Sequence, residues 1–466
     1  MPVPGSSASP AAVRPLRVAV VGAGPAGIYT AEALSRQDAV PVAIDLLDRL
    51  PTPFGLVRHG IAPDHEKMRA LRTTLHHALD HPRVRFVGNV DIGIDVSLAE
   101  LRRHVDAVVY TYGASGDRRI GLEGEDLPGS IAATDLVAWY CGHPDADRAL
   151  VEAAVAHARS VVVVGVGNVA LDVARVLART ASELEGTDMP QHVLDALAAA
   201  PVQQVTVLGR RGPAQAAFTT QELRELNGLA GAIVIVDPAD LGHDAAEEHS
   251  DRAIARNLAE LRGWVGHRPR PGTIALRLQF HRRPVRLLGS DRVSGIEVER
   301  TVVDDDGVAT GTGELSVLPA DLVVRSVGYR GHPLPDLPVD PRTGTVDHDK
   351  GRVLRDGRPS PGEYAAGWIK RGPTGVVGTN KHDAHETVAS LLADAESGLL
   401  HAGGPVDDLV DTMLLRGLEP VLLDNWLAID AAEAELGASR GRRRTTLHER
   451  ELLLEAARRG RAILPG

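Results

Sequence analysis

The strongest constraint on the fold is a glycine pattern that occurs twice in this chain. Its first copy lies in LRVAVVGAGPAGIYTAEAL, where an apolar run over 18–21 is followed by Gly22, Gly24 and Gly27 and then by a helical pattern. Glycines at this spacing after a buried strand permit a tight turn, and they let backbone N–H groups and the helix N-terminus approach a pyrophosphate. This copy predicts one Rossmann-like dinucleotide-binding domain.

The second copy of the pattern lies in RSVVVVGVGNVALDVARVLART. An apolar run over 161–164 leads into Gly165, Gly167 and Ala170, and a helical pattern follows. The chain has 466 residues, about three times the length of a typical domain, so it has room for two such units. The two copies together predict an α/β fold with two Rossmann-like dinucleotide-binding domains.

The residues that follow the second strand of each unit differ in charge. In the first unit, PVAIDLLD ends in Asp48, with Asp45 as a competing candidate. A carboxylate here bonds a free ribose 2′-hydroxyl and repels a 2′-phosphate. In the second unit, VQQVTVLGRRGP ends in Arg210 and Arg211, whose guanidiniums can bind a 2′-phosphate, although a pair of merely exposed arginines is the alternative. We therefore expect FAD or NAD in the first site and NADP(H) in the second.

Two sites with opposite ribose preferences indicate a flavoprotein that takes a hydride from NADPH, because a flavin and a nicotinamide that meet can exchange one. DAVVYTYGAS and DLVVRSVGYRG each resemble a buried strand that stops at a glycine, as expected where the chain leaves one Rossmann domain and later returns to it. We expect a disordered tail over 1–14, a FAD-binding domain formed by 15–114 and 331–466, and an NADP-binding domain over 115–330 inserted within it.

Composition excludes several other classes of protein. The formal net charge of −11 disfavours a general binder of nucleic acid or of anionic membranes. Cys141 is the only cysteine, so one chain can build neither a disulfide nor a cysteine-ligated iron–sulfur cluster, and we expect no metal site. The sequence contains no signal-peptide pattern and no run of 18 apolar residues, so we expect a cytoplasmic protein whose electrons are held by a bound cofactor.

Long strings of this sequence resemble the adrenodoxin reductase family, including the bacterial ferredoxin–NADP reductases of that type. The strings are PTPFGLVRHGIAPDHEKMR, GNVALDVARVL, GRRGPAQAAFTTQELRELNGL, VVRSVGYRG and GWIKRGPTGVVGTNK, and the resemblance runs from about residue 16 to about residue 392. It implies a ferredoxin–NADP+ reductase that contains FAD and NADP(H). Thioredoxin reductases, which share the two-Rossmann plan but use a dithiol, are excluded by the single cysteine.

The resemblance assigns cofactor contacts to particular positions. For FAD these are Ala26, Asp48, Leu56, Ile92, Trp368, Gly375, Val376 and Val377. For NADP they are Arg118, Val166, Gly167, Asn168, Val169, Arg210, Arg211, Glu222 and Gly375. The family often has glutamate where this chain has the shorter Asp48.

Hydride transfer requires the nicotinamide to approach the flavin closely, and we expect Gly375 in RGPTGVVG to be the point of closest approach. A helix expected to begin near Thr379 or Asn380 would direct its positive end toward the flavin. The resemblance also makes His65 a candidate for proton exchange with a carboxylate such as Asp172 or Glu225. A surface or helix-cap histidine is the alternative for His65.

The electron acceptor implied by the resemblance is an acidic ferredoxin that docks transiently by charge complementarity. Arginines in GRRGPAQAAFTTQELREL, including Arg224, could supply the positive rim, and the basic C-terminal tail is interpreted as a solvated helix. One alternative is an NADPH oxidase or monooxygenase in which reduced flavin meets oxygen. Another is a flavin-binding interaction protein without turnover, which the RGPTGVVG segment and Arg210 and Arg211 disfavour.

Overall fold

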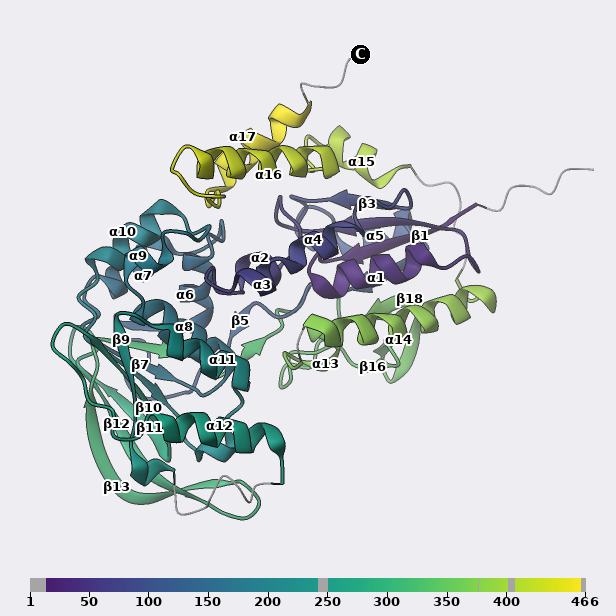
Figure 1. Ribbon diagram of the computed structural model, residues 1–466. Helices are drawn as coiled ribbons and strands as arrows, with labels where there is room; N and C mark the ends of the chain where they lie inside the picture. The colour runs from purple at the N-terminus through teal and green to yellow at the C-terminus, as the bar shows by residue number, and fades with distance from the viewer. Residues whose placement is uncertain (1–13, 242–249, 376, 401–406, 462–466) are drawn as a thin grey trace, which may run out of the picture.

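The computed structural model describes residues 14–241, 250–375, 377–400 and 407–461, and two large sheets, one mixed and one parallel, dominate it (Figure 1). The first sheet has seven strands in the order β16-β17-β18-β4-β1-β2-β3. Its strands are β1 (Leu16–Val21), β2 (Val42–Leu47), β3 (Val84–Val87), β4 (Ala107–Tyr110), β16 (His348–Asp349), β17 (Arg352–Arg355) and β18 (Arg358–Ala365). The strands β16 to β18 pair antiparallel with one another, and β18 joins β4 in parallel.

The second sheet has six strands, all paired in parallel, in the order β6-β14-β7-β8-β10-β9. Its strands are β6 (Ser130–Ala132), β7 (Ser160–Val164), β8 (Gln204–Leu208), β9 (Ala232–Val236), β10 (Ile274–Gln279) and β14 (Leu322–Arg325). All of them lie between β4 and β16 in the sequence. The predicted α/β fold, in which one nucleotide-binding unit is inserted in another, is therefore confirmed.

Each glycine fingerprint follows a central strand of its sheet. β1 lies between β4 and β2, and β7 lies between β14 and β8, so each fingerprint is placed where the strand order reverses. At the C-terminal end of β1, Val21 is in register with both Leu47 and Tyr110. This switch point is where open parallel sheets bind nucleotides, because the loops on either side diverge there.

Helices cover both sheets. Those of the first unit are α1 (Pro25–Arg36), α2 (Leu56–His59), α3 (Glu66–Arg69), α4 (Leu71–His76), α5 (Leu98–His104), α13 (Trp368–Arg371), α14 (Val377–Glu396), α15 (Leu409–Leu415), α16 (Leu423–Ala438) and α17 (Arg450–Arg461). Those of the second are α6 (Ala133–Tyr140), α7 (Arg148–Val155), α8 (Asn168–Ala178), α9 (Ala181–Leu184), α10 (Gln191–Ala199), α11 (Thr220–Glu225) and α12 (Arg252–Gly263).

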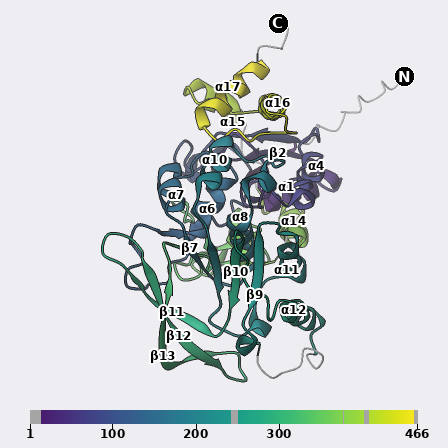
Figure 2. The same cartoon turned by 60° about the vertical axis from the view of Figure 1, so that its left-hand side comes forward.

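A third, antiparallel sheet of β11 (Arg282–Leu288), β12 (Gly295–Val303) and β13 (Ala309–Pro319) lies at the outer side of the second unit (Figure 2). Its residues Ile296 and Val298 share a buried apolar cluster with Val162 and Val323 of the six-stranded sheet. The two crossings between the units meet in a short antiparallel ribbon of β5 (Gly116–Asp117) and β15 (Tyr329–Arg330).

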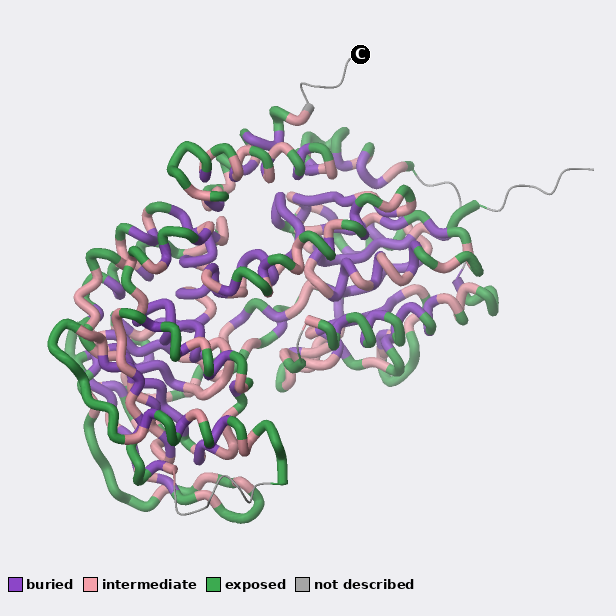
Figure 3. The backbone as a smooth tube through the Cα atoms, viewed as in Figure 1, coloured by how far each residue is buried: buried purple, intermediate pink, exposed green. Residues whose placement is uncertain are grey.

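The basic C-terminal tail is docked, and its interpretation as a solvated helix is wrong. One face of α17 is buried through Leu453, Ala456 and Ala457, whereas its other face is exposed (Figure 3). In α16, Trp426 packs edge-on against Phe54 with ring centroids 5.8 Å apart. The apolar residues of α17 are spaced so that they lie on one side of the helix, and α16 packs against that side. This packing stabilises α17, since a helix of this length is not stable alone in water.

The first residue of α17 and the segment before it contact both nucleotide-binding units. Arg450 donates to Asn89 Oδ1 at 3.1 Å in the first unit and to Asp145 Oδ1 at 3.0 Å in the second. Arg442 donates to the carbonyl oxygen of Met189 at 2.9 Å. No helix among the described residues is long and apolar enough to cross a membrane. Of the expected tail over 1–14, residues 1–13 lie outside the described ranges, and Arg14 forms an ion pair with Asp106.

Candidate active site between two nucleotide loops

The three glycines of the first fingerprint have different surroundings. Gly22 has φ +109, and a Cβ there would lie 2.6 Å from Tyr112 Cα. A Cβ on Gly27 would overlap the carbonyl oxygen of Gly22, so this glycine lets α1 pack against the turn. Gly24 is different, because its Cβ would meet only Gly55 Cα at 3.9 Å. The first and third glycines are required by the fold, and the middle one leaves an open cradle at the N-terminus of α1.

The second fingerprint repeats this division of roles. Gly165 has φ +133, and a Cβ on it would overlap the carbonyl oxygen of Ser326. Ala170, in the third position, is fully buried. Gly167, the N-cap of α8, has nothing within 4 Å of its Cβ position. No protein atom of the described residues fills the space at the middle glycine of either loop. Both loops can therefore accommodate a pyrophosphate, the group that this glycine pattern binds in Rossmann domains.

The ribose end of the first loop distinguishes the two competing aspartates. Asp45 is engaged by Arg85, whose Nε and Nη2 donate to its two oxygens at 2.7 and 3.1 Å. Asp48 lies past the end of β2 and accepts from the backbone N–H of Ala23, inside the fingerprint, at 2.7 Å. Burial raises the pKa of Asp48, and backbone hydrogen bonds from Leu50 and Ala23 oppose that rise. Asp48 is therefore the carboxylate beside the nucleotide loop.

The ribose end of the second loop is positively charged and unoccupied by protein groups. Arg210 is exposed and Arg211 is partly exposed. Their backbones are fixed, because the Arg210 carbonyl accepts from Thr301 Oγ1 at 2.7 Å and the Arg211 carbonyl accepts from the His281 N–H at 3.1 Å. Among the described residues, neither guanidinium has a hydrogen-bond or ion-pair partner. Both are available to an anion.

The remaining NADP candidates lie around the second fingerprint. The Val166 carbonyl accepts from the Ala217 N–H at 2.9 Å, and Asn168 Oδ1 accepts from the Thr219 N–H at 2.8 Å, so the loop before α11 rests on the fingerprint. Val169 follows in the first turn of α8 and is partly exposed. Arg118 lies on the crossing to the second unit, where its N–H donates to the Gly328 carbonyl at 3.2 Å and its side chain is exposed.

The returning segment GWIKRGPTGVVGTNK lies against the first fingerprint. A Cβ on Gly367 would be 2.5 Å from Ala26 Cβ, so only a glycine permits this contact at φ +78. Trp368 follows at the start of α13, and its ring lies 5.5 Å from that of Tyr329. The structure thus brings Ala26 close to Gly367, the residue before Trp368, from a distant part of the chain.

Lys370, whose role was not evident from the sequence, is a buried anchor for this segment. Its Nζ bonds Asp383 Oδ1 at 2.8 Å and Glu386 Oε2 at 2.5 Å, both in α14. The other oxygen of Asp383 accepts from the Gly367 N–H. Lys370 therefore fixes the segment to α14, which begins at Val377 and not near Thr379 or Asn380 as predicted.

Gly375 needs to be glycine for a local reason. It is exposed with φ +83, and a Cβ would lie 2.9 Å from Thr379 Cβ. Val376 lies outside the described residues, and Val377 is partly exposed. Leu56 begins α2 directly after Gly55, which touches Gly24, whereas Ile92 is buried in an apolar cluster with Val21 and Val90.

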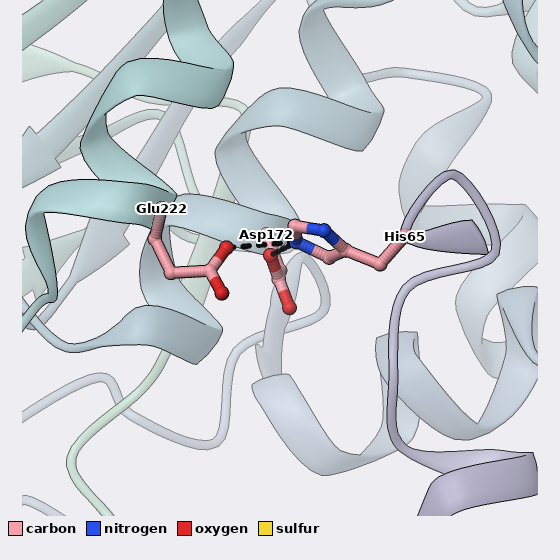
Figure 4. A group of neighbouring side chains, drawn as sticks. All are labelled: His65, Asp172 and Glu222. Atoms are coloured by element: carbon pink, nitrogen blue, oxygen red, sulfur yellow. Dashed lines mark hydrogen bonds and ion pairs between the residues drawn. The ribbon is translucent and has the colours of Figure 1, made fainter. Parts of the chain in front are cut away.

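His65 and two carboxylates form a buried cluster between the two units (Figure 4). His65 Nε2 lies 3.0 Å from Asp172 Oδ1 and 2.7 Å from Glu222 Oε2. The second carboxylate is thus Glu222, which had been assigned to NADP, and not Glu225. Both glutamates occur in α11 and lie on neighbouring turns of one face; Glu222, in the first turn, contacts His65, while Glu225 lies about one turn further along the helix.

The cluster holds His65 in its charged form. Burial alone would lower the pKa of His65, but hydrogen bonds to Asp172 and Glu222 raise it to about 9. The ligand atoms of the three side chains lie within 4.8 Å of one another. However, Arg175 Nη1 already contacts Asp172 Oδ1 at 2.8 Å. With an imidazolium and a guanidinium in place, the carboxylates are neutralised without a metal ion.

The fold and this site define a class of protein: a two-Rossmann oxidoreductase with one open glycine cradle in each unit, where a carboxylate follows the second strand of the first unit and two arginines follow that of the second. A family model described as pyridine nucleotide-disulphide oxidoreductase matches residues 16–225. The chain has no partner for Cys141, which is buried, so the disulfide chemistry in that description does not apply.

Comparisons with individual proteins narrow the class to a family. The chain is 42% identical to "NADPH-ferredoxin reductase FprA" of Mycobacterium tuberculosis over 451 residues, which cover 93% of this chain and 97% of the relative. It is 37% identical to "NADPH:adrenodoxin oxidoreductase, mitochondrial" of Arabidopsis thaliana, over 96% of this chain and 97% of the relative. The solved structure of FprA in complex with NADPH superposes with a TM-score of 0.90 at 42% identity, over 95% of this chain and 100% of that one. The chain belongs to the family of NADPH–ferredoxin and adrenodoxin reductases.

Proposed function

We propose that this chain is an FAD-dependent ferredoxin–NADP+ reductase that moves electrons between NADPH and a ferredoxin-type one-electron carrier. The observation that carries the proposal is the pair of open glycine cradles, at Gly24 and Gly167, with a carboxylate at the ribose end of one and two unpaired arginines at the ribose end of the other. The family relationship supports the same activity. An ordinary Rossmann protein with one nucleotide has no need of the second cradle.

The FAD site is assigned to Gly22, Gly24, Ala26, Gly27, Asp48, Leu56, Ile92, Trp368, Gly375, Val376 and Val377. The NADP site is assigned to Arg118, Val166, Gly167, Asn168, Val169, Arg210, Arg211, Glu222 and Gly375. The contact between Gly367 and Ala26 supports placing the returning segment at the FAD site. The pairing of β5 with β15 supports domain boundaries at residues 115 and 330, with the FAD-binding domain formed by 15–114 and 331–466.

FAD, when bound, accepts a hydride and releases single electrons. The residues of the chain would bind and orient the nucleotides: the N-termini of α1 and α8 would hold the two pyrophosphates, and Arg210 and Arg211 would hold the 2′-phosphate. The middle glycines allow the backbone to come close to the ligands. His65 holds a proton at Nε2 between Asp172 and Glu222, where it can be given or taken at the boundary between the units.

The acceptor is proposed to be an acidic ferredoxin in a transient complex, and the protein is proposed to act in the cytoplasm. Arg224 is a weak candidate for the docking surface, because its Nε is 2.6 Å from Glu260 Oε1 and its charge is already offset. Arg210, Arg211 and Arg118 are exposed or partly exposed and lack such an offset. In this proposal, however, their primary role is to bind NADPH and not to dock ferredoxin.

The proposal is tested on the purified holoprotein with a panel of plant-type and bacterial-type ferredoxins, with molecular oxygen as the competing acceptor. We expect a yellow protein with a flavin spectrum and NADPH-dependent reduction of at least one ferredoxin much faster than oxygen consumption. A colourless protein that gains no activity from added FAD would contradict the cofactor assignment. Oxygen consumption as fast as the best ferredoxin reduction would favour an oxidase.

The 2′-phosphate assignment has its own test. Each charge-assisted hydrogen bond is worth about 1.5–3 kcal/mol, so replacing Arg210 and Arg211 together by alanine, which removes at least one such bond from each, should weaken NADPH use about 100-fold or more. NADH use should be nearly unchanged, since NADH has no 2′-phosphate. Arg252→Ala, at an exposed arginine of α12, is the matched control. Equal losses with NADPH and NADH would refute the assignment.

A further inference from the structure

A buried ion pair between Arg175 and Asp64 adjoins the cluster of His65, Asp172 and Glu222, and the proposed proton exchange does not involve it. Arg175 is fully buried in α8. Its Nε and Nη2 donate to Asp64 Oδ2 and Oδ1 at 2.7 and 2.9 Å, which is the planar bidentate geometry of the strongest arginine–carboxylate pairs. Its third nitrogen, Nη1, lies 2.8 Å from Asp172 Oδ1. One guanidinium therefore holds two carboxylates that come from different units.

Both members of the Arg175–Asp64 pair are linked to His65: Asp64 along the chain, and Arg175 through its contact with Asp172. Asp64 directly precedes His65 in the segment before α3, in the first unit. Asp172 is one helical turn from Arg175 in α8, in the second unit. The His65 ring thus extends from the first unit toward Asp172, which Arg175 orients. Arg175 also binds the side chain of Asp64, the residue that precedes His65.

The cluster pairs buried charges of both signs. Asp64, Asp172 and Glu222 carry three negative charges, and Arg175 and protonated His65 lie among them. Arg179 Nε lies 2.9 Å from Asp64 Oδ2, and its Nη1 is shared with Glu183 Oε1 at 3.4 Å. The other titratable side chains that face Asp172 are Tyr140, Tyr329 and Cys141. Burial raises the pKa of both phenols and raises that of the Cys141 thiol to about 12, so all three stay neutral.

We propose that the Arg175–Asp64 pair positions His65, so that its Nε2 sits between Asp172 and Glu222 and the two nucleotide-binding units are held in register at the place where a proton is exchanged. The geometry itself does not depend on the reductase activity, and only its kinetic consequence rests on the proposed function. Arg175 does not bond His65 itself in this role, although its Nη1 contacts Asp172 and lies 3.7 Å from Glu222 Oε2. It acts through Asp64 and Asp172.

A positioning role and a purely electrostatic role of Arg175 predict opposite changes in the pKa of His65 when Arg175 is replaced. If Arg175 were only a nearby cation, removing its charge would stabilise the imidazolium and raise the pKa of His65 further, because a like charge disfavours protonation. If Arg175 positions the ring, its loss frees His65 from the two carboxylates, and the pKa of His65 falls toward its ordinary value near 6.5. Arg175→Lys separates the two ideas as well, since it keeps the charge but not the bidentate grip.

The experiment is an NMR titration of the histidine imidazoles in the holoprotein, labelled at histidine. The chain has 19 histidines, and the His65 signal is identified by its absence from the His65→Gln variant. We expect the pKa of His65 to fall by about one unit or more in Arg175→Met and in Arg175→Lys. Arg352→Met, which removes a bidentate pair with Asp394 near the C-terminal end of α14, should leave it unchanged. If Arg175→Met does not fold, Arg175→Lys and the control still decide the question.

A rise in the pKa of His65 in Arg175→Met, or no change in Arg175→Lys, would overturn the positioning role. The pH profile of flavin reduction by NADPH gives a second readout, in which the limb that reports His65 should move to lower pH by the same shift. A protein that proves inactive with every ferredoxin would refute the proposed function, yet the NMR titration would still measure the Arg175 effect. Failure of the two proposals is therefore distinguishable.

Discussion

Replacing Gly167 with alanine should separate folding from nucleotide binding in the second unit. Gly167 is the N-cap of α8 with φ −104 and ψ 177, an extended conformation that alanine adopts without strain. A Cβ there meets no atom within 4 Å. The added methyl group therefore costs nothing in contacts, but it occupies the cradle where a pyrophosphate approaches the helix N-terminus.

The expected changes in the free energy of unfolding and in the Kd for NADP+ can be estimated separately for Gly167→Ala. Gly→Ala restricts the unfolded chain and stabilises by about 0.4–1 kcal/mol, while alanine is a poorer N-cap than glycine by a similar amount. The free energy of unfolding should thus change by less than about 1 kcal/mol. If the methyl group prevents one backbone N–H from bonding the pyrophosphate, about 1.5–3 kcal/mol is lost, so the Kd for NADP+ should rise about 10- to 100-fold.

Isothermal titration calorimetry with NADP+ and urea unfolding measure the two quantities, and FAD content should remain that of the unchanged protein. The matched variant is Gly165→Ala, in the same loop, where φ is +133 and the new Cβ would overlap the Ser326 carbonyl. That variant should lose stability as well as binding. A folded Gly167→Ala protein that binds NADP+ with unchanged affinity would show that the nucleotide does not approach this glycine.

Three further outcomes are expected. Lys370→Met should lower the free energy of unfolding by about 3 kcal/mol because it removes the cation nearest to the buried Asp383 and leaves, among the described cations, only Arg371 Nε at 3.7 Å, whereas Lys381→Met, at a half-exposed lysine, should change it by less than about 1 kcal/mol in the same urea titration. Arg58→Leu should release the C-terminal helices to limited proteolysis, since Arg58 pairs with the buried Glu433 at 2.5 Å; unchanged protease resistance would contradict this. Because the pKa of His65 is raised to about 9, its stabilising contribution is complete below pH 6.5 and lost as the pH rises through 9, so stability between pH 7 and 10 should fall less in His65→Gln than in the unchanged protein.

The parts of the fold that could be predicted from sequence are those set by local pattern. Both fingerprint strands and the insertion of one unit in the other follow from glycine spacing and apolar runs, which act over a few residues. The position of α14 was missed by two or three residues, because GPTGVVG gives no clear helix start. The docked tail was missed for a different reason: the many arginines around α17 obscured the apolar face formed by Leu453, Ala456 and Ala457.

The site was predicted in outline, and its errors come from contacts between distant parts of the chain. Asp172 was identified as a partner of His65, but the choice between Glu222 and Glu225 depends on which residue caps α11, and that is set by packing of Thr219 against the fingerprint loop. The Arg175–Asp64 pair joins residues 111 positions apart, and no local pattern marks it. The spacing of Asp172 and Arg175 in DVAR indicates only the contact within α8 between these two residues.

The arginines at the second ribose site show why pairing, and not exposure, identifies a binding residue in this chain. The net charge is −11, so carboxylates are plentiful and most positions for a guanidinium offer one nearby. Arg58, Arg85 and Arg175 each bond carboxylates at 2.5 to 2.7 Å. Arg210 and Arg211 stand apart from such partners, although bonds to their carbonyl groups hold the backbone in place. Among the residues that the structure describes, these two guanidiniums have no carboxylate partner although they lie at the end of a nucleotide-binding strand, and we therefore propose that they neutralise a 2′-phosphate, the anion that this position receives in NADP-binding Rossmann units.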